Sequence, residues 1–138
     1  MKTYYDFLQE QLSDVKNTEV EPVTNLPKIF RLLCCLLNEE SLGKEARWKV
    51  NCALAYLVNS EDVIDEDVYG AEGYMDDLYV CCLVLVTLMD DYKALIEKLW
   101  PESETVINDC YNRSEAFLDR KHMREDVVAF SRVLENRC

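Results

Sequence analysis

Glycine and proline are scarce in this chain, with three of each among 138 residues. A fold of many short β-strands needs such residues at its turns, so their scarcity disfavours β-sandwiches and β-barrels. Hydrophobic residues make up 49% of the chain, which is the composition of a globular protein and not of a disordered one. A chain of this length most often forms one domain. The sequence therefore predicts a single, compact, all-α domain over residues 1–138.

Zinc-binding motifs are also lacking. His122 is the sole histidine, and the seven cysteines include no C-x-x-C pair, so the ligand spacing of structural zinc sites is absent. Four cysteines form two adjacent pairs inside apolar runs: Cys34, Cys35, Cys81 and Cys82. Cysteine without a metal or disulfide partner behaves as a small hydrophobic residue. We therefore expect these four thiols to be mostly buried and unpaired.

No segment of the sequence is apolar for long enough to cross a membrane. The longest apolar run, Leu78–Met89, is interrupted only by Thr87 and is shorter than the roughly 20 residues that a spanning helix needs. The segment Met1–Glu10 lacks the apolar stretch of a secretory signal peptide. We therefore expect a cytoplasmic protein with reduced thiols and no membrane insertion.

Positive charge is in short supply. The chain carries 27 acidic and 15 basic side chains, for a formal net charge of −12. Such a surface repels the phosphate backbone of nucleic acids, so binding of nucleic acid is not expected. The same charge attracts basic molecules. Solubility alone is one explanation of this acidity, and an unknown, basic protein partner is the other.

Hydrophobic residues recur at helical spacing along most of the chain, which predicts five to seven helices. The segments with this pattern are residues 4–15, 26–37, 44–58, 74–100 and 102–137. Residues 102–137 leave open whether they form one bent helix or two. Residues 16–25 break the pattern and contain Pro22, which indicates a loop. Ser41 is a candidate N-cap of the third helix, and Arg47 in that helix is expected to face solvent.

The segment 59–78, NSEDVIDEDVYGAEGYMDDL, concentrates acidic side chains between two apolar helices. From Asp65 onward it resembles a calcium-binding EF-hand loop, with acids at the first, third and twelfth positions and Gly at the sixth. Tyr69 and Glu72 depart from that pattern, and Asp76 stands at the twelfth position where the loop normally carries Glu. A looser site for Ca²⁺ or Mg²⁺ stays open, and its candidate ligands are Asp62, Asp65, Asp67, Asp76 and Asp77.

Two other interpretations compete with the metal site. Catalysis by paired carboxylates finds no support elsewhere, because the chain has no phosphate-binding Gly-rich loop and no G-x-S-x-G motif. We therefore predict no catalytic residue, no enzymatic activity and no bound cofactor. In the structural interpretation, Asp62 caps the turn, Gly70 and Gly73 give it backbone freedom, and Asp76 and Asp77 begin the next helix. A tight acidic turn between two core helices explains most of these residues.

The segment 53–80 resembles the YkvA family, a bacterial and archaeal domain of unknown function. The family pattern reads Y-L-x-S-P-x-D-L-I-P-D, a short gap, then G-x-x-D-D. The matching residues are Tyr56, Leu57, Asp62, Val63, Ile64, Gly73, Asp76 and Asp77. Ser60 and Asp65 stand where the family has proline, and the gap before Gly73 is one residue longer. The resemblance implies a prokaryotic helical domain with its core at about residues 44–100, and it implies no activity.

These observations favour a small binding or regulatory module that acts through protein–protein contacts. One alternative is a divalent-metal site at the acidic turn, residues 62–77. The other is an acidic immunity-like or antitoxin-like protein that neutralises a basic partner, which is suggested by size and charge.

Overall fold

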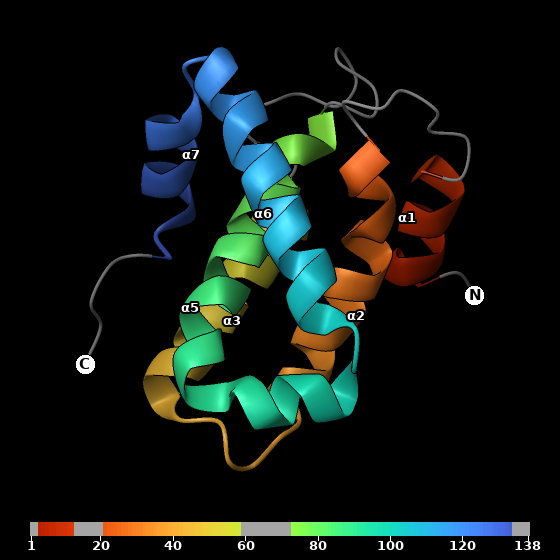
Figure 1. The fold of residues 1–138 in the computed structure, drawn as a ribbon, viewed down its shortest axis with the longest axis vertical. Helices are drawn as coiled ribbons and strands as arrows, with labels where there is room; N and C mark the ends of the chain where they lie inside the picture. The colour runs from red at the N-terminus through yellow and green to blue at the C-terminus, as the bar shows by residue number, and fades with distance from the viewer. Residues whose placement is uncertain (1–2, 13–20, 59–72, 134–138) are drawn as a thin grey trace.

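The structure is a computed structural model that describes residues 3–12, 21–58 and 73–133 (Figure 1). These residues form helices and no strands. In chain order the elements are α1 (Tyr4–Leu12), the 3₁₀-helix η1 (Glu21–Asn25), α2 (Leu26–Leu37), α3 (Lys44–Val58), α5 (Met75–Leu99), α6 (Ser103–Arg120) and α7 (Arg124–Ser131). The prediction of one compact all-α arrangement is confirmed.

Helix α5 lies at the centre of the arrangement. It packs against α2, α3, α6 and α7, while α1 covers the outer side of α2 (Figure 1). Every residue from Met75 to Cys82 is buried, so the beginning of α5 is enclosed on all sides. The apolar run that the sequence placed in the core is therefore a core helix. Within the described ranges, no helix has the length and apolar character that crossing a membrane requires.

Helix α5 bends at Tyr92, whose backbone angles (φ −125°, ψ 21°) are not helical. The bend brings the Tyr92 hydroxyl to the start of α3, where the Gly43 N–H donates a hydrogen bond to it at 3.0 Å. A Cβ atom at position 43 would lie 3.2 Å from the same oxygen, which is why glycine suits this close approach. Helix α3 begins directly after Gly43, so the prediction of Ser41 as its N-cap is wrong.

Arg47 is half-buried, and the prediction that it faces solvent is wrong. Its guanidinium donates hydrogen bonds to the carbonyl oxygens of Leu37, Glu39 and Leu42 at 2.5, 3.0 and 3.3 Å. These carbonyls belong to the end of α2 and to the connection that follows it, where the helix leaves backbone acceptors unsatisfied. A single cation from α3 therefore closes the α2–α3 connection.

Residues 21–25 were expected to be a loop, but they form η1. The Thr24 hydroxyl donates a hydrogen bond to the Glu21 carbonyl at 2.7 Å, which closes the turn locally. Pro22 is buried, and its carbonyl oxygen lies 3.8 Å from Cys110 Sγ on α6. Packing against α6 is a tertiary contact, so local periodicity in the sequence carried no signal for this element.

The C-terminal segment contains two helices. The sequence had left open whether residues 102–137 form one bent helix or two. Helix α6 ends at Arg120 and α7 begins at Arg124. His122 lies between them with a positive φ of 57°, in the left-handed region where histidine is tolerated better than most residues. Arg124 then pairs with Glu115 at 3.1 Å and with Asp119 at 2.8 Å, which fixes the start of α7 against α6.

The described thiols divide into two groups by burial. Cys81, Cys82 and Cys110 are buried, as the sequence predicts for the first two. Cys34 and Cys35 on α2 are less enclosed and are only partly buried. Burial raises the pKa of the Cys82 thiol well above its usual value and raises that of Cys34 as well. A raised pKa means less thiolate and slower alkylation.

Thiol labelling tests this division. We expect N-ethylmaleimide to modify Cys35 and Cys52, which are both half-buried, before Cys81, Cys82 and Cys110 in the native protein. Peptide mass spectrometry after timed quenching gives the rate at each site, and the same reaction in urea serves as the control in which all sites react. Native-state labelling of Cys81 or Cys82 at the rate of Cys52 would contradict the enclosed position of α5.

Candidate functional site

The acidic turn is only partly described by the structure. Asp62, Asp65 and Asp67 lie outside the described residues. Asp76 and Asp77 are described, and both lie in the first turn of α5, as the sequence predicts. Their exposed fractions are 0% and 1%, so they belong to the core and not to the surface.

Two buried carboxylates need stabilisation inside the protein, because a charge transferred out of water without partners is very costly. Part of that stabilisation comes from Tyr56 on α3. Its hydroxyl donates a hydrogen bond to Asp76 Oδ2 at 2.6 Å, a short O–H···O distance. The N-terminus of α5 supplies further positive potential through the helix dipole. The pair Tyr56–Asp76 therefore ties α3 to α5 at the level of the core.

The ring of Tyr56 connects this buried pair to the surface. It meets the ring of Phe130 on α7 edge to face, with the centroids 5.8 Å apart and the planes at 76°. Edge-to-face contact is a favourable geometry for aromatic pairs. Phe130 is nevertheless 46% exposed, so one side of its ring packs on Tyr56 and the rest faces solvent.

Helix α7 presents an outward face with a mixed chemical character. Val127 and Ser131 are buried, whereas the exposed residues are Arg124, Glu125, Asp126, Ala129 and Phe130. We call Glu125, Asp126, Ala129 and Phe130 the α7 face. A partly exposed aromatic side chain beside charged groups is the composition of many protein contact surfaces. Phe130 falls within the helical pattern of residues 102–137, but periodicity alone does not show which apolar residue of a helix stays exposed.

The described ranges contain no group of three or more His, Cys, Asp or Glu side chains arranged to hold a metal ion. Asp76 and Asp77 alone do not form such a group, and the three other candidate ligands belong to residues that are not described. The metal site at residues 62–77 therefore stays a prediction.

The fold and site define a small all-α protein with two buried aspartates at the start of its central helix. The chain is similar to the uncharacterized protein ORF9 of Methanothermobacter thermautotrophicus, with 35% identity over 117 residues that cover 82% of this chain and 80% of that protein. The chain belongs to the same family as ORF9. No family model matches the chain, and no solved structure matches it.

Replacing Tyr56 with Phe tests the role of the buried hydrogen bond. The variant removes the donor and leaves an acceptor oxygen of Asp76 without it in the core, so we expect a loss of about 1–3 kcal/mol in the free energy of unfolding. Urea denaturation followed by circular dichroism measures this loss. The control is Tyr92→Phe, which removes the hydroxyl that accepts from the exposed Gly43 N–H. A loss for Tyr56→Phe no larger than that for Tyr92→Phe would show that burial does not strengthen the bond to Asp76.

Proposed function

We propose that this protein is a small binding or regulatory module that acts through contact with another protein, and that it is not an enzyme. The observation that carries the proposal is the α7 face, where Phe130 is exposed although its ring is held by Tyr56. A large aromatic side chain that is already fixed in position loses little conformational entropy when a partner covers it. We therefore propose that Phe130 is the anchor residue of the contact with the partner protein.

Charge supports a basic partner. Glu125 and Asp126 are exposed beside Phe130, and the whole chain carries a net charge of −12. Complementary charge at the rim of an interface accelerates association and disfavours partners of the wrong sign. Neutralisation of a basic protein, in the manner of an immunity protein or an antitoxin, is a special case of this proposal.

The pattern shared with the YkvA family also supports a binding role. Its described residues, Tyr56, Leu57, Gly73, Asp76 and Asp77, are all buried. Buried residues of this kind build the fold, while a catalytic centre needs groups that reach a substrate. We therefore propose that the family pattern marks a structural core, that the chain is YkvA-like, and that it acts in the cytoplasm.

Binding measurements with a Phe130→Ala variant test the proposed surface. A partner captured from the source organism is identified, purified and titrated against the wild-type protein and the variant by calorimetry. We expect a Kd about tenfold or more higher for Phe130→Ala, because truncation of an aromatic anchor costs on the order of 2 kcal/mol. The matched control is Phe7→Ala on α1, since Phe7 is 43% exposed and lies on another helix.

Two results would refute this surface. One is a partner that binds Phe130→Ala and the wild-type protein with the same Kd. The other is an equal loss for Phe7→Ala, which would indicate a general effect of exposed aromatic residues. Matching circular dichroism spectra and melting temperatures establish beforehand that each variant is folded. Added salt should lower the association rate of a basic partner.

A divalent-cation site at the acidic turn 62–77 is the second candidate. The burial of Asp76 and Asp77 favours it, because buried carboxylates are often paired or coordinate metals. Against it, the hydrogen bond from Tyr56 and the helix dipole already stabilise Asp76 without an ion. Asp62, Asp65 and Asp67 would complete the oxygen ligands that Ca²⁺ or Mg²⁺ requires.

Thermal unfolding with added cations separates these possibilities. We expect millimolar Ca²⁺ or Mg²⁺ to shift the melting temperature only slightly and without selectivity. A specific site would instead add about 2.7 kcal/mol of stability at a hundredfold excess of ion over Kd. A large shift for one cation that Asp76→Asn abolishes, and that the exposed-residue control Asp90→Asn preserves, would establish the metal site and contradict this expectation.

A further inference from the structure

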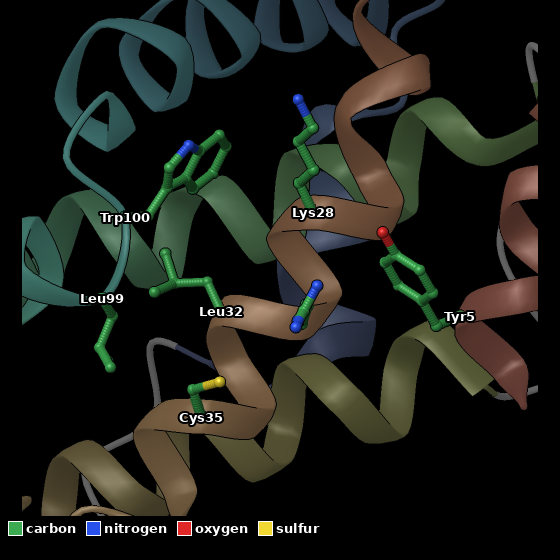
Figure 2. A pocket seen from close by; sticks show the side chains of 7 residues that line it. Tyr5, Lys28, Leu32, Cys35, Leu99 and Trp100 are labelled. Carbon is green, nitrogen blue, oxygen red and sulfur yellow. The ribbon is translucent and has the colours of Figure 1, made fainter.

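A groove crosses the outer face of α2, on the other side of the molecule from α7 (Figures 1 and 2). Its volume is about 370 Å³, and small-molecule sites commonly have roughly 300–1,000 Å³. It is lined by Tyr5, Lys28, Arg31, Leu32, Cys35, Leu99 and Trp100. Three segments that are far apart in the sequence therefore meet at this groove: α1, α2 and the end of α5.

The charge of the groove is opposite to that of the protein. Two cations line it, Lys28 and Arg31, and none of the lining residues that the structure describes is acidic. Elsewhere in the described ranges, cations such as Lys93 and Arg124 pair with carboxylates, whereas no such ion pair involves Lys28 or Arg31. Both side chains are exposed, so their charged groups are open to a ligand.

The two cations lie on one side of the helix, because residues three apart on a helix are neighbours. Like charges at this spacing destabilise a helix slightly. Arg31 makes a cation–π contact with Tyr5, and the Arg31 Cζ atom lies 5.9 Å from the centroid of the Tyr5 ring. An anion in the groove would relieve the repulsion between Lys28 and Arg31.

The other half of the groove is apolar and fixed in position. Trp100 is the C-cap of α5, with an extended backbone, and its N–H donates to the Ile96 carbonyl at 2.9 Å. Its own carbonyl accepts from the Ser103 N–H at 3.0 Å, so the backbone that carries the indole is bonded on both sides. Figure 2 shows Trp100 and Leu99 on one side of α2, with Lys28 between them and Tyr5.

We propose that this groove binds a small organic anion. Lys28 and Arg31 hold its carboxylate or phosphate group, and Trp100 and Leu32 contact a flat apolar body. The guanidinium of Arg31 matches the paired oxygens of both head groups, and the Lys28 ammonium adds a point charge. The indole offers a face for an aromatic ring at the distance of van der Waals contact. This site is separate from the α7 face and does not depend on the proposed protein partner.

Calorimetric titration with aromatic anions tests the site. The probes are 1-naphthoate and 1-naphthyl phosphate, which distinguish a carboxylate from a phosphate as the preferred head group. We expect saturable binding of at least one of them. Neutral 1-naphthalenemethanol and inorganic phosphate should bind about tenfold or more weakly, because each lacks one half of the contacts, and a factor of ten corresponds to about 1.4 kcal/mol.

Paired variants assign the binding to the groove. The double variant Lys28→Gln, Arg31→Gln should raise the Kd of the preferred probe about tenfold or more. The control, Lys44→Gln with Lys121→Gln, removes the same charge from two exposed residues outside the groove and should change the Kd less than about twofold. Melting curves that match the wild-type protein establish that both variants are folded.

Three results would overturn the proposal. The first is the absence of saturable binding of either aromatic anion at millimolar concentration. The second is equal weakening in the groove variant and the control, which would show a diffuse charge effect. The third is equal affinity for the neutral alcohol, which would leave only an apolar surface. None of these results bears on partner binding at Phe130, so the two proposals fail independently.

Discussion

The complete burial of the beginning of α5 is the constraint on which the rest of the structure depends. A helix that is enclosed from Met75 to Cys82 has no side that faces water, so neighbouring helices must cover it on every side. The same enclosure places two aspartates in the core, where their carboxylates require partners from the surrounding elements. The Tyr56 hydroxyl is one such partner, since it donates a hydrogen bond to Asp76. The same bond fixes the position of α3 along the axis of α5.

The position of α7 follows from this arrangement. A helix of eight residues is too short to be stable by itself, so its order must come from tertiary contacts. Arg124 holds its start against α6, and the Lys49 ammonium donates to the Val133 carbonyl just beyond its end, at 3.2 Å. Phe130 rests on Tyr56 between these two points. The exposed part of that ring is therefore presented by a helix that is fastened at both ends.

The sequence predicted the elements that depend on local pattern. Hydrophobic spacing located α2 and α3, apart from the wrong cap at Ser41, and it placed the long helix between Gly73 and Pro101. It also put the two aspartates in the first turn of α5, because an acid at a helix N-terminus is favourable. Their burial was not predicted, since a run of acids reads as a solvated surface until the helices around it are known.

Features that depend on contacts between distant segments were missed. The bend at Tyr92 accompanies a hydrogen bond to Gly43, 49 positions earlier in the chain. The break between α6 and α7 stayed open in the sequence, because no glycine or proline marks it at His122. The sequence did not predict the groove on α2 for the same reason. Lys28 and Arg31 read as ordinary surface cations, and only the fold brings Trp100 to their side.

The two surfaces lie in different electrostatic surroundings, which has a consequence for their binding. A basic partner is attracted to the α7 face by nearby acids and by the net charge of −12 together, so salt screens both contributions. A small anion approaching Lys28 and Arg31 is attracted by these cations but repelled by the rest of the protein. Salt then weakens both the attraction of the anion to Lys28 and Arg31 and its repulsion by the net negative charge. These two effects of salt on the affinity partly cancel. Anion binding in the groove should therefore depend less on salt than partner binding at Phe130.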